Sequence, residues 1–188
     1  MDGSKLLIVV DYQKDFVDGA LGFAGAELLD LRIAAKICAY HEAGDVVVFT
    51  YDTHRKNYLN TQEGRKLPVE HCICGSDGWE IYGETAKQMA EEDLCFQKPT
   101  FPSLELADYI AEEEFESIEL VGLVSHMCVL SNAVMAKAAA PEAEIVIDAS
   151  CTASFDAALH EKALDVMEAL QMTVLNRGKK GRYHAIRQ

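Results

Sequence analysis

Hydrophobic residues occur along this chain in short continuous runs that alternate with longer, periodically spaced segments. The runs KLLIVVD at 5–11 and DVVVFTYD at 45–52 are apolar at successive positions. Such runs are typical of strands that are buried on both faces of a parallel sheet. Together with shorter runs later in the chain, the pattern predicts six strands, at 5–11, 45–52, 94–98, 117–124, 143–149 and 172–176.

The segments between these runs place apolar residues three and four positions apart, which predicts amphipathic helices. Gly44 follows one such segment as an expected C-cap, and Ser103 and Ser154 precede two others as expected N-caps. The helices are expected at 27–43, 84–93, 103–114, 129–140 and 155–171.

Strands that alternate with helices predict a three-layer α/β/α fold of the Rossmann-like kind: an open, mainly parallel six-stranded sheet with helices on both faces. The length of 188 residues suits a single domain over 1–188. Turn-forming residues with little periodicity predict a long loop at 53–79. The tail at about 177–188 is basic and is expected to be mobile or bound at the sheet edge.

Charge and composition narrow the classes of partner. The formal net charge of −14 argues against binding to nucleic acid or to an anionic membrane. No stretch approaches the roughly 20 apolar residues of a membrane span, and the opening residues lack the long apolar core of a signal peptide. The six cysteines are therefore expected to be free thiols in a cytoplasmic protein.

Reactive side chains stand at the predicted carboxyl ends of several strands. Asp11 ends the first strand, Lys98 ends the third, and Cys128 follows the fourth. The carboxyl ends of parallel strands meet at one edge of a sheet, where ligands bind, so we expect these side chains to lie together. The start of the helix after Cys128 and the Lys98 ammonium would favour a thiolate, and Asp11 would move the thiol proton.

This set of groups suits acyl transfer from a small amide, with backbone N–H groups near Val124 and Cys128 holding an oxyanion. Structural alternatives stand beside this interpretation: Asp11 as a turn residue, Lys98 as a solvated strand end, and Cys128 as a buried small hydrophobe. The residues alone leave both interpretations open.

Short motifs along the chain resemble, in order and spacing, those of the isochorismatase-like cysteine hydrolases. The motifs are DYQKDF at 11–16, D-x-H at 52–54, HCICGSDG at 71–78, the lysine at 98 and GLVSHMCV at 122–129. The resemblance spans residues 6 to about 155 and is closest to the nicotinamidase (pyrazinamidase) branch.

The resemblance implies roles for individual residues. It implies a catalytic triad of Asp11, Lys98 and Cys128. It implies an oxyanion hole formed by the N–H groups of Val124 and Cys128, with a cis peptide between Leu123 and Val124. The substrate-binding residues that it implies are Phe16, Leu123 and Val124.

Asp52, His54 and His71 match the metal ligands of the nicotinamidase branch. Asp and His two positions apart can face one ion, and three protein ligands leave coordination positions open, as in catalytic zinc sites. Zinc is the first choice, with iron and manganese as alternatives. Without the resemblance, these residues would be interpreted as loop caps and a core histidine. No nucleotide cofactor is expected, because no glycine-rich phosphate loop follows a strand.

The chain departs from the nicotinamidase pattern in two places. Leu67 stands where an aromatic residue usually precedes the proline before the metal histidine. Ser125 and His126 replace a common Thr-Asp pair before the cysteine. An aromatic wall for the substrate is then expected from another residue, and the candidates are Phe16, Tyr58, Trp79 and Phe101, of which Phe16 best matches the family's ring-contacting position.

The sequence therefore predicts an amidohydrolase that converts a small aromatic amide, nicotinamide before others, to the acid and ammonia through a Cys128 thioester. Such an enzyme would act in NAD salvage and pyridine nucleotide biosynthesis. The alternatives are an enzyme for another small amide of the carbamoyl or isochorismatase-related branches, and a non-catalytic small-molecule-binding or redox-sensing protein that uses Cys128. The expected partner is a small-molecule amide, and a homo-oligomer is left open.

Overall fold

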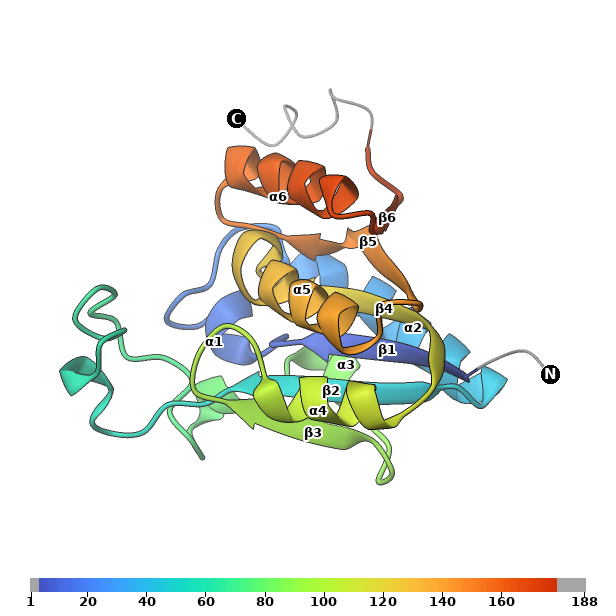
Figure 1. The fold of residues 1–188 in the computed structure, drawn as a ribbon. Helices are drawn as coiled ribbons and strands as arrows, with labels where there is room; N and C mark the ends of the chain where they lie inside the picture. The colour runs from blue at the N-terminus through green and yellow to red at the C-terminus, as the bar shows by residue number, and fades with distance from the viewer. Residues whose placement is uncertain (1–3, 179–188) are drawn as a thin grey trace.

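The computed structural model describes residues 4–178, which build one sheet between two layers of helices (Figure 1). The strands are β1 Ser4–Val10, β2 Val46–Asp52, β3 Leu94–Lys98, β4 Phe115–Leu123, β5 Glu144–Ala153 and β6 Thr173–Leu175. They lie in the order β3-β2-β1-β4-β5-β6, and each neighbouring pair is parallel. The predicted α/β/α fold is confirmed.

Helices cover both faces of the sheet. They are α1 Lys14–Val17, α2 Asp30–Ala43, α3 Gly83–Lys87, α4 Leu104–Glu112, α5 Leu130–Ala139 and α6 Ala157–Ala169. In Figure 1, α4, α5 and α6 lie in front of the sheet and α2 lies behind it. None of the helices in the described part of the chain has both the length and the apolar character that a membrane span needs.

The alternating side chains of β1 explain its continuous apolar run. Leu6, Ile8 and Val10 belong to the core under α4, α5 and α6. Leu7 and Val9 belong to the core on the opposite face, against α2. All five side chains are fully buried, as is expected for a central strand covered on both faces.

The order of the strands reverses between β1 and β4. From β1 the chain moves outward to β2 and β3, and it then returns to the other side of β1 with β4, β5 and β6. Ligands bind at such a switch point, beyond the carboxyl ends of the two strands. Asp11 and Val124 are the residues that follow β1 and β4 there.

Two helix boundaries differ from the prediction because polar side chains bind the backbone in competition with the helix. The helix expected at 84–93 ends at Lys87, and Asp93 Oδ2 then accepts the Ala90 N–H at 2.9 Å. Asp156, and not Ser154, caps α6, since its side chain accepts the N–H groups of the helix's first turn. Ser103 is confirmed as the N-cap of α4.

Three further segments differ in extent. β5 continues to Ala153, beyond the predicted end at 149, because its pairing with β4 resumes after a register shift. The short helix α1 was not expected. A π-helical turn, η4 Ser125–Val129, precedes the helix expected from 129.

The loop at 53–79 is confirmed as a segment without long elements, containing only the short turns η2 Tyr58–Asn60 and η3 Asp77–Trp79. The predicted basic tail begins at Arg177. Its guanidinium forms ion pairs with three acidic residues of α6, Glu161, Asp165 and Glu168. Residues 179–188 of the tail lie outside the described residues.

Candidate functional site

Asp11 directly follows β1 at a residue whose backbone is left-handed, with a φ of 44°. Residues other than glycine rarely adopt this conformation, and those that do gather at functional sites. The side chain is fully buried. Its Oδ1 accepts a hydrogen bond from Thr50 Oγ1 at 2.6 Å, and its Oδ2 lies 2.5 Å from Lys98 Nζ. Burial raises the pKa of Asp11 and outweighs the attraction of the ammonium.

Lys98 is the last residue of β3 and is 1 % exposed. Its Nζ lies between Asp11 Oδ2 and Cys128 Sγ, 3.6 Å from the sulfur. It also donates a hydrogen bond to the Thr100 carbonyl at 3.0 Å. Burial lowers the pKa of Lys98, but the carboxylate of Asp11 in contact with it outweighs this effect and raises the pKa. The ammonium therefore stays charged in the middle of the site.

Cys128 lies within η4, on the turn that leads into α5, and is 7 % exposed. The structure brings it, Asp11 and Lys98 into one chain of contacts, as the sequence predicted. Burial, however, acts against the thiolate that the helix start and Lys98 were expected to favour. Burial raises the pKa of the Cys128 thiol well above its usual value, and nearby Lys98 compensates only in part. Burial therefore favours the thiol form, from which a proton has to be removed before the sulfur can act as a nucleophile.

Asn132 of α5 ties the backbone of Cys128 to the segment that follows Lys98. Its Nδ2 donates to the Cys128 carbonyl at 2.8 Å and to the Phe101 carbonyl at 3.1 Å. Its Oδ1 accepts the Ser103 N–H at 3.0 Å. The sequence motifs did not single out this buried amide, because its partners lie 4, 29 and 31 positions away.

The end of β4 approaches β1 closely. Gly122 has a φ of 108°, and a side chain there would collide with the Val10 carbonyl, so only glycine fits. The Leu123–Val124 peptide is cis, as the resemblance implied. Leu123 is fully buried and Val124 nearly so.

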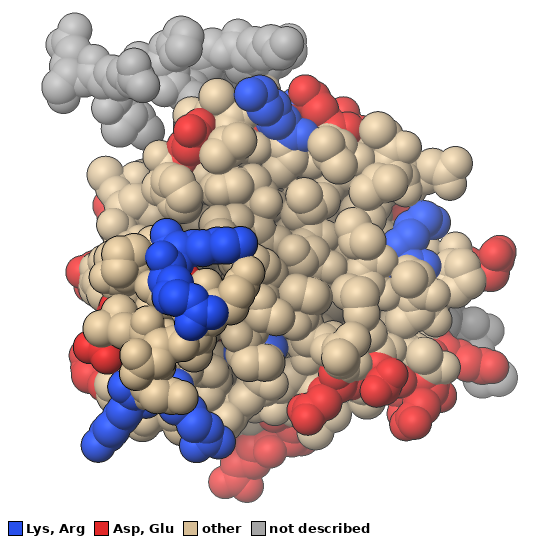
Figure 2. Space-filling model, turned by 60° about the vertical axis from the view of Figure 1, so that its left-hand side comes forward, with Lys and Arg blue, Asp and Glu red and all other residues tan. Residues whose placement is uncertain are grey.

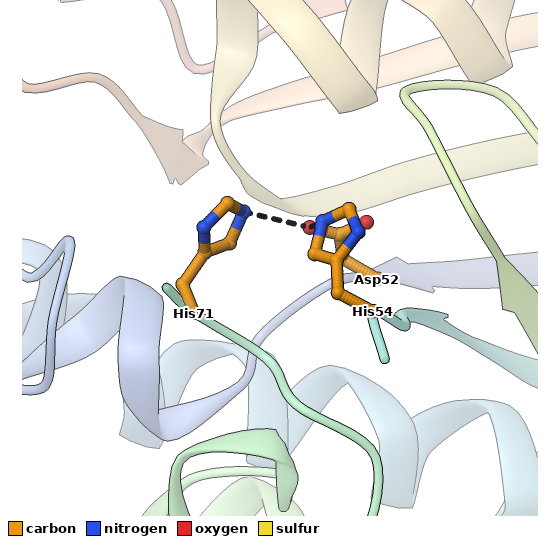
Figure 3. Close-up of side chains that lie close together, drawn as sticks. All are labelled: Asp52, His54 and His71. Carbon is orange, nitrogen blue, oxygen red and sulfur yellow. Dashed lines mark hydrogen bonds and ion pairs between the residues drawn. The ribbon is translucent and has the colours of Figure 1, made fainter. Parts of the chain in front are cut away.

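Asp52, His54 and His71 form the cluster that the sequence predicted. All three are buried, and their potential ligand atoms lie within 4.8 Å of one another. Asp52 Oδ2 is 3.1 Å from His54 Nε2 and 3.2 Å from His71 Nε2. In Figure 3, His71 reaches toward Asp52 from a separate segment of the chain.

The hydrogen bonds of His71 indicate that this cluster fits a cation. Its Nδ1 lies 2.8 Å from the Val69 carbonyl, which can only accept, so Nδ1 carries the proton. In the neutral ring, Nε2 then presents a lone pair to Asp52 Oδ2, which is also an acceptor. Two acceptors at this distance need a proton or a metal ion between them. A histidine with one nitrogen fixed on a carbonyl is typical of metal ligands.

Backbone contacts bring the two ends of the long loop together. The His54 N–H donates to the Cys72 carbonyl, and the Cys74 N–H donates to the His54 carbonyl, both at 2.9 Å. Gln13 pairs with both backbone groups of Asp52, and Asp15 Oδ2 accepts the Cys72 N–H at 2.7 Å. Gln13 and Asp15 of the first motif therefore position the metal-ligand segments.

Glu63 is a residue that sequence reasoning missed. Its Oε1 lies 3.7 Å from His54 Nε2 and 4.0 Å from His71 Nε2, so it faces the same point as the predicted ligands. Nothing in its surroundings in the sequence, TQEGR, distinguishes it from a solvated acidic residue. Glu63 is distinguished only in the folded chain, where the loop returns over the two histidines.

The four candidates for an aromatic wall have separate places. Phe16 contacts the His71 ring, with centroids 5.6 Å apart. Tyr58 is fully buried and packs on both histidines, at 4.6 and 5.0 Å, so it supports the cluster. Trp79 packs on Tyr51, and Phe101 is 37 % exposed. Phe16 is the candidate beside the metal-ligand cluster with a ring that is not fully buried.

The family model of the isochorismatase domain matches residues 5–177 of this chain. No curated protein matches the sequence. The nicotinamidase/pyrazinamidase structure from Bacillus subtilis is 29 % identical, with a TM-score of 0.82 over 91 % of this chain and 98 % of that one. The pyrazinamidase/nicotinamidase from Streptococcus mutans is 26 % identical, with a TM-score of 0.81 over 92 % of this chain and 100 % of that one.

The same fold occurs in more distant structures. The pyrazinamidase of Pyrococcus horikoshii in complex with zinc is 22 % identical, with a TM-score of 0.81 over 92 % of this chain and 98 % of that one. The N-carbamoylsarcosine amidase of Thermoplasma acidophilum is 20 % identical, with a TM-score of 0.73 over 91 % and 95 %. With the family model matched along nearly its whole length, this chain belongs to the isochorismatase family.

Proposed function

We propose that this protein is an amidohydrolase that converts a small aromatic amide, nicotinamide before others, to its acid and ammonia. The observation that carries the proposal is the contact chain from Asp11 through Lys98 to Cys128, beside the cluster of Asp52 and the two histidines. The similarity to two nicotinamidase structures supports it. Nicotinamide hydrolysis would place the enzyme in NAD salvage.

The buried thiol determines the first chemical step. Asp11 takes the proton of Cys128 as the sulfur attacks the amide carbon, and the carbonyl oxygen becomes an oxyanion. The backbone N–H groups of Val124 and Cys128 hold this oxyanion. The Lys98 ammonium, in contact with both partners, stabilises the negative charge while it moves from Asp11 to sulfur and oxygen.

Asp11 then returns the proton to the leaving nitrogen. The C–N bond breaks, ammonia departs, and an acyl thioester remains on Cys128. A water molecule attacks the thioester carbon and gives one proton to Asp11, which passes it to the departing sulfur. The acid is released and the thiol is restored, so that one amide and one water yield one acid and one ammonia.

Asp52, His54 and His71 would hold a divalent metal ion beside this triad, with Glu63 as a further donor. Zinc is the first choice for this donor set, and iron and manganese are the alternatives. When bound, the ion would supply a Lewis acid that orients the ring of the substrate. Asp52 Oδ1 lies 3.9 Å from Lys98 Nζ, so the two clusters are neighbours.

The alternative of a redox sensor has less support. A sensing cysteine needs an exposed thiolate, whereas Cys128 is 7 % exposed and its thiol pKa is raised by burial. The alternative of a different amide keeps the same chemistry, and the leucine at 67 in place of an aromatic residue supports testing it.

The test is ammonia release from nicotinamide by metal-loaded protein. We expect turnover by the wild type, a loss of about a thousandfold or more in Cys128→Ala, and a loss of about a hundredfold in His54→Ala. Cys95→Ala, which changes an exposed cysteine, is the matched control and should stay active. Turnover that survives Cys128→Ala would contradict the thioester, and cleavage of other amides alone would contradict nicotinamide as the substrate.

A further inference from the structure

A hollow lined mainly by polar residues adjoins the metal-ligand cluster at His54. Its volume is about 430 Å³, and it is lined by Thr53, His54, Arg55, Asn57, Thr61, Gln62, Glu63, Pro99 and Thr100. A smaller hollow of about 170 Å³ shares part of this wall and reaches the end of β3, with a lining of Thr53, Arg55, Gln97, Lys98 and Pro99. The two hollows thus border one residue of the metal-ligand cluster and one residue of the triad.

Arg55 lines both hollows and is exposed. Within residues 4–178, its guanidinium has no ion pair or hydrogen bond. The acidic residue of the larger hollow, Glu63, directs its carboxylate oxygen at His54 and His71. The hollow therefore presents a cation whose five N–H donors are free to bind a ligand.

The long loop that carries Arg55 exposes four basic and two acidic residues, in a chain with a net charge of −14. Its exposed basic residues are Arg55, Lys56, Arg65 and Lys66. Figure 2 shows most of the basic side chains of one face gathered at its left, with acidic side chains along the bottom and around the edges. A local positive potential beside this hollow draws anions toward it.

We propose that this hollow is a subsite for a carboxylate carried by the amide substrate, and that Arg55 is the residue that determines this specificity. The inference rests on the proposed amidohydrolase function and adds a substrate class beside nicotinamide, which has no anionic group: amides that bear a carboxylate. A guanidinium binds a carboxylate through two parallel hydrogen bonds. Thr53, Asn57 and Thr100 offer further polar groups around it.

Two ring amides that differ only in the carboxylate test the subsite, benzamide and 3-carbamoylbenzoate. Binding is measured by calorimetry on metal-loaded Cys128→Ala protein, which cannot turn the ligands over, and kcat and KM are measured on the wild type. We expect 3-carbamoylbenzoate to bind about tenfold more tightly than benzamide, as one charge-assisted contact allows. Arg55→Gln should abolish this preference by raising KM with little change in kcat.

Lys56→Gln is the matched control, since it removes a neighbouring exposed charge that lines neither hollow. It should leave the preference intact. An equal loss of the preference in both variants would show that the loop attracts anions in general and would overturn the subsite. Equal binding of the two amides to the protein with Arg55 in place would also overturn it. Arg55-dependent binding without any hydrolysis by the wild type would keep the subsite and contradict the proposed function instead.

Discussion

Asp52 makes contacts in three directions, and each serves a different part of the site. Its backbone N–H and carbonyl are both held by the Gln13 amide, at 2.8 and 2.9 Å. Its Oδ2 meets the two histidines, and its Oδ1 lies 3.9 Å from the Lys98 ammonium. A single carboxylate thus joins the metal-ligand cluster to the triad. A change in the charge at one cluster is therefore expected to alter the electrostatic potential at the other.

At the same scale, Glu63 is expected to contribute to metal binding. Glu63→Gln keeps the size of the side chain but removes the charge that faces His54 and His71. We expect the affinity for zinc to fall by about 10- to 100-fold, measured by competition with a chelator of known affinity. The control is Glu70→Gln, an exposed acid of the same loop. An unchanged affinity in Glu63→Gln would place Glu63 outside the coordination sphere.

Among the elements, α2 is bound to the sheet by a charged cluster beneath it. Lys36 Nζ of α2 lies 2.6 Å from Glu119 of β4 and 2.9 Å from Asp148 of β5. Tyr40, one turn further, donates to the other oxygen of Glu119 at 2.7 Å. These pairs are largely shielded from water, so removing one partner leaves a charge without compensation. The cluster fixes α2 across two strands.

Asp148 makes the stability of this arrangement depend on pH. Burial raises the pKa of Asp148, but hydrogen bonds from Asn176, Lys36 and Ser150 outweigh it and bring the value to about 2. A carboxyl group whose pKa is lower in the folded state than the unfolded value of about 3.9 stabilises the fold above that value and ceases to do so as the pH falls toward 2. The group is therefore stabilising at neutral pH.

Asp148→Asn should accordingly lower the free energy of unfolding by about 1–2 kcal/mol at pH 7, measured by urea denaturation. The difference between wild type and variant should shrink as the pH falls from 4 toward 2, because Asp148 gains a proton as the pH approaches its folded-state pKa. Glu84→Gln, at the exposed pair with Lys87, is the control, with an effect below about 0.5 kcal/mol. A difference for Asp148→Asn that stays constant with pH would assign its effect to packing.

The long loop gives the whole molecule its open side. It leaves the sheet after Asp52, and Figure 1 shows part of it standing away from the body, while its return segment crosses back over the start. The proposed metal ligands come from its beginning, its middle and its far end. A bound ion would thus hold the loop in its closed conformation and offset the conformational entropy that is lost when the loop becomes ordered.

Limited proteolysis measures this closure. The loop contains four trypsin sites, at Arg55, Lys56, Arg65 and Lys66, and all four side chains are exposed. We expect removal of the metal by chelation to speed cleavage in this loop by about tenfold or more, and zinc to restore resistance. Cleavage at Lys162, within α6, is the internal reference. An unchanged rate of loop cleavage in the presence of the chelator would contradict the proposal that a metal ion closes the loop.

The pattern of apolar runs by itself determined the sheet and the edge at which the site forms. Each strand that is buried on both faces reads as a continuous apolar run, as β1 and β2 do. Parallel strands end at one edge, so the chain positions of Asp11, Lys98 and Cys128 were enough to expect them together. Asp52, His54 and His71 were found through a family resemblance, because their approach depends on the return of the loop.

Tertiary structure alone decided the features that depend on partners far away in the sequence. Asp93 and Asp156 set helix ends through side-chain hydrogen bonds that compete with the helix pattern. Glu63 faces the histidines only because the loop folds back. Burial among residues far away in the sequence raises the pKa of the Cys128 thiol, and no local pattern encodes that burial. Periodicity reports which side of an element is buried; the groups that meet across that surface are known only once the chain has folded.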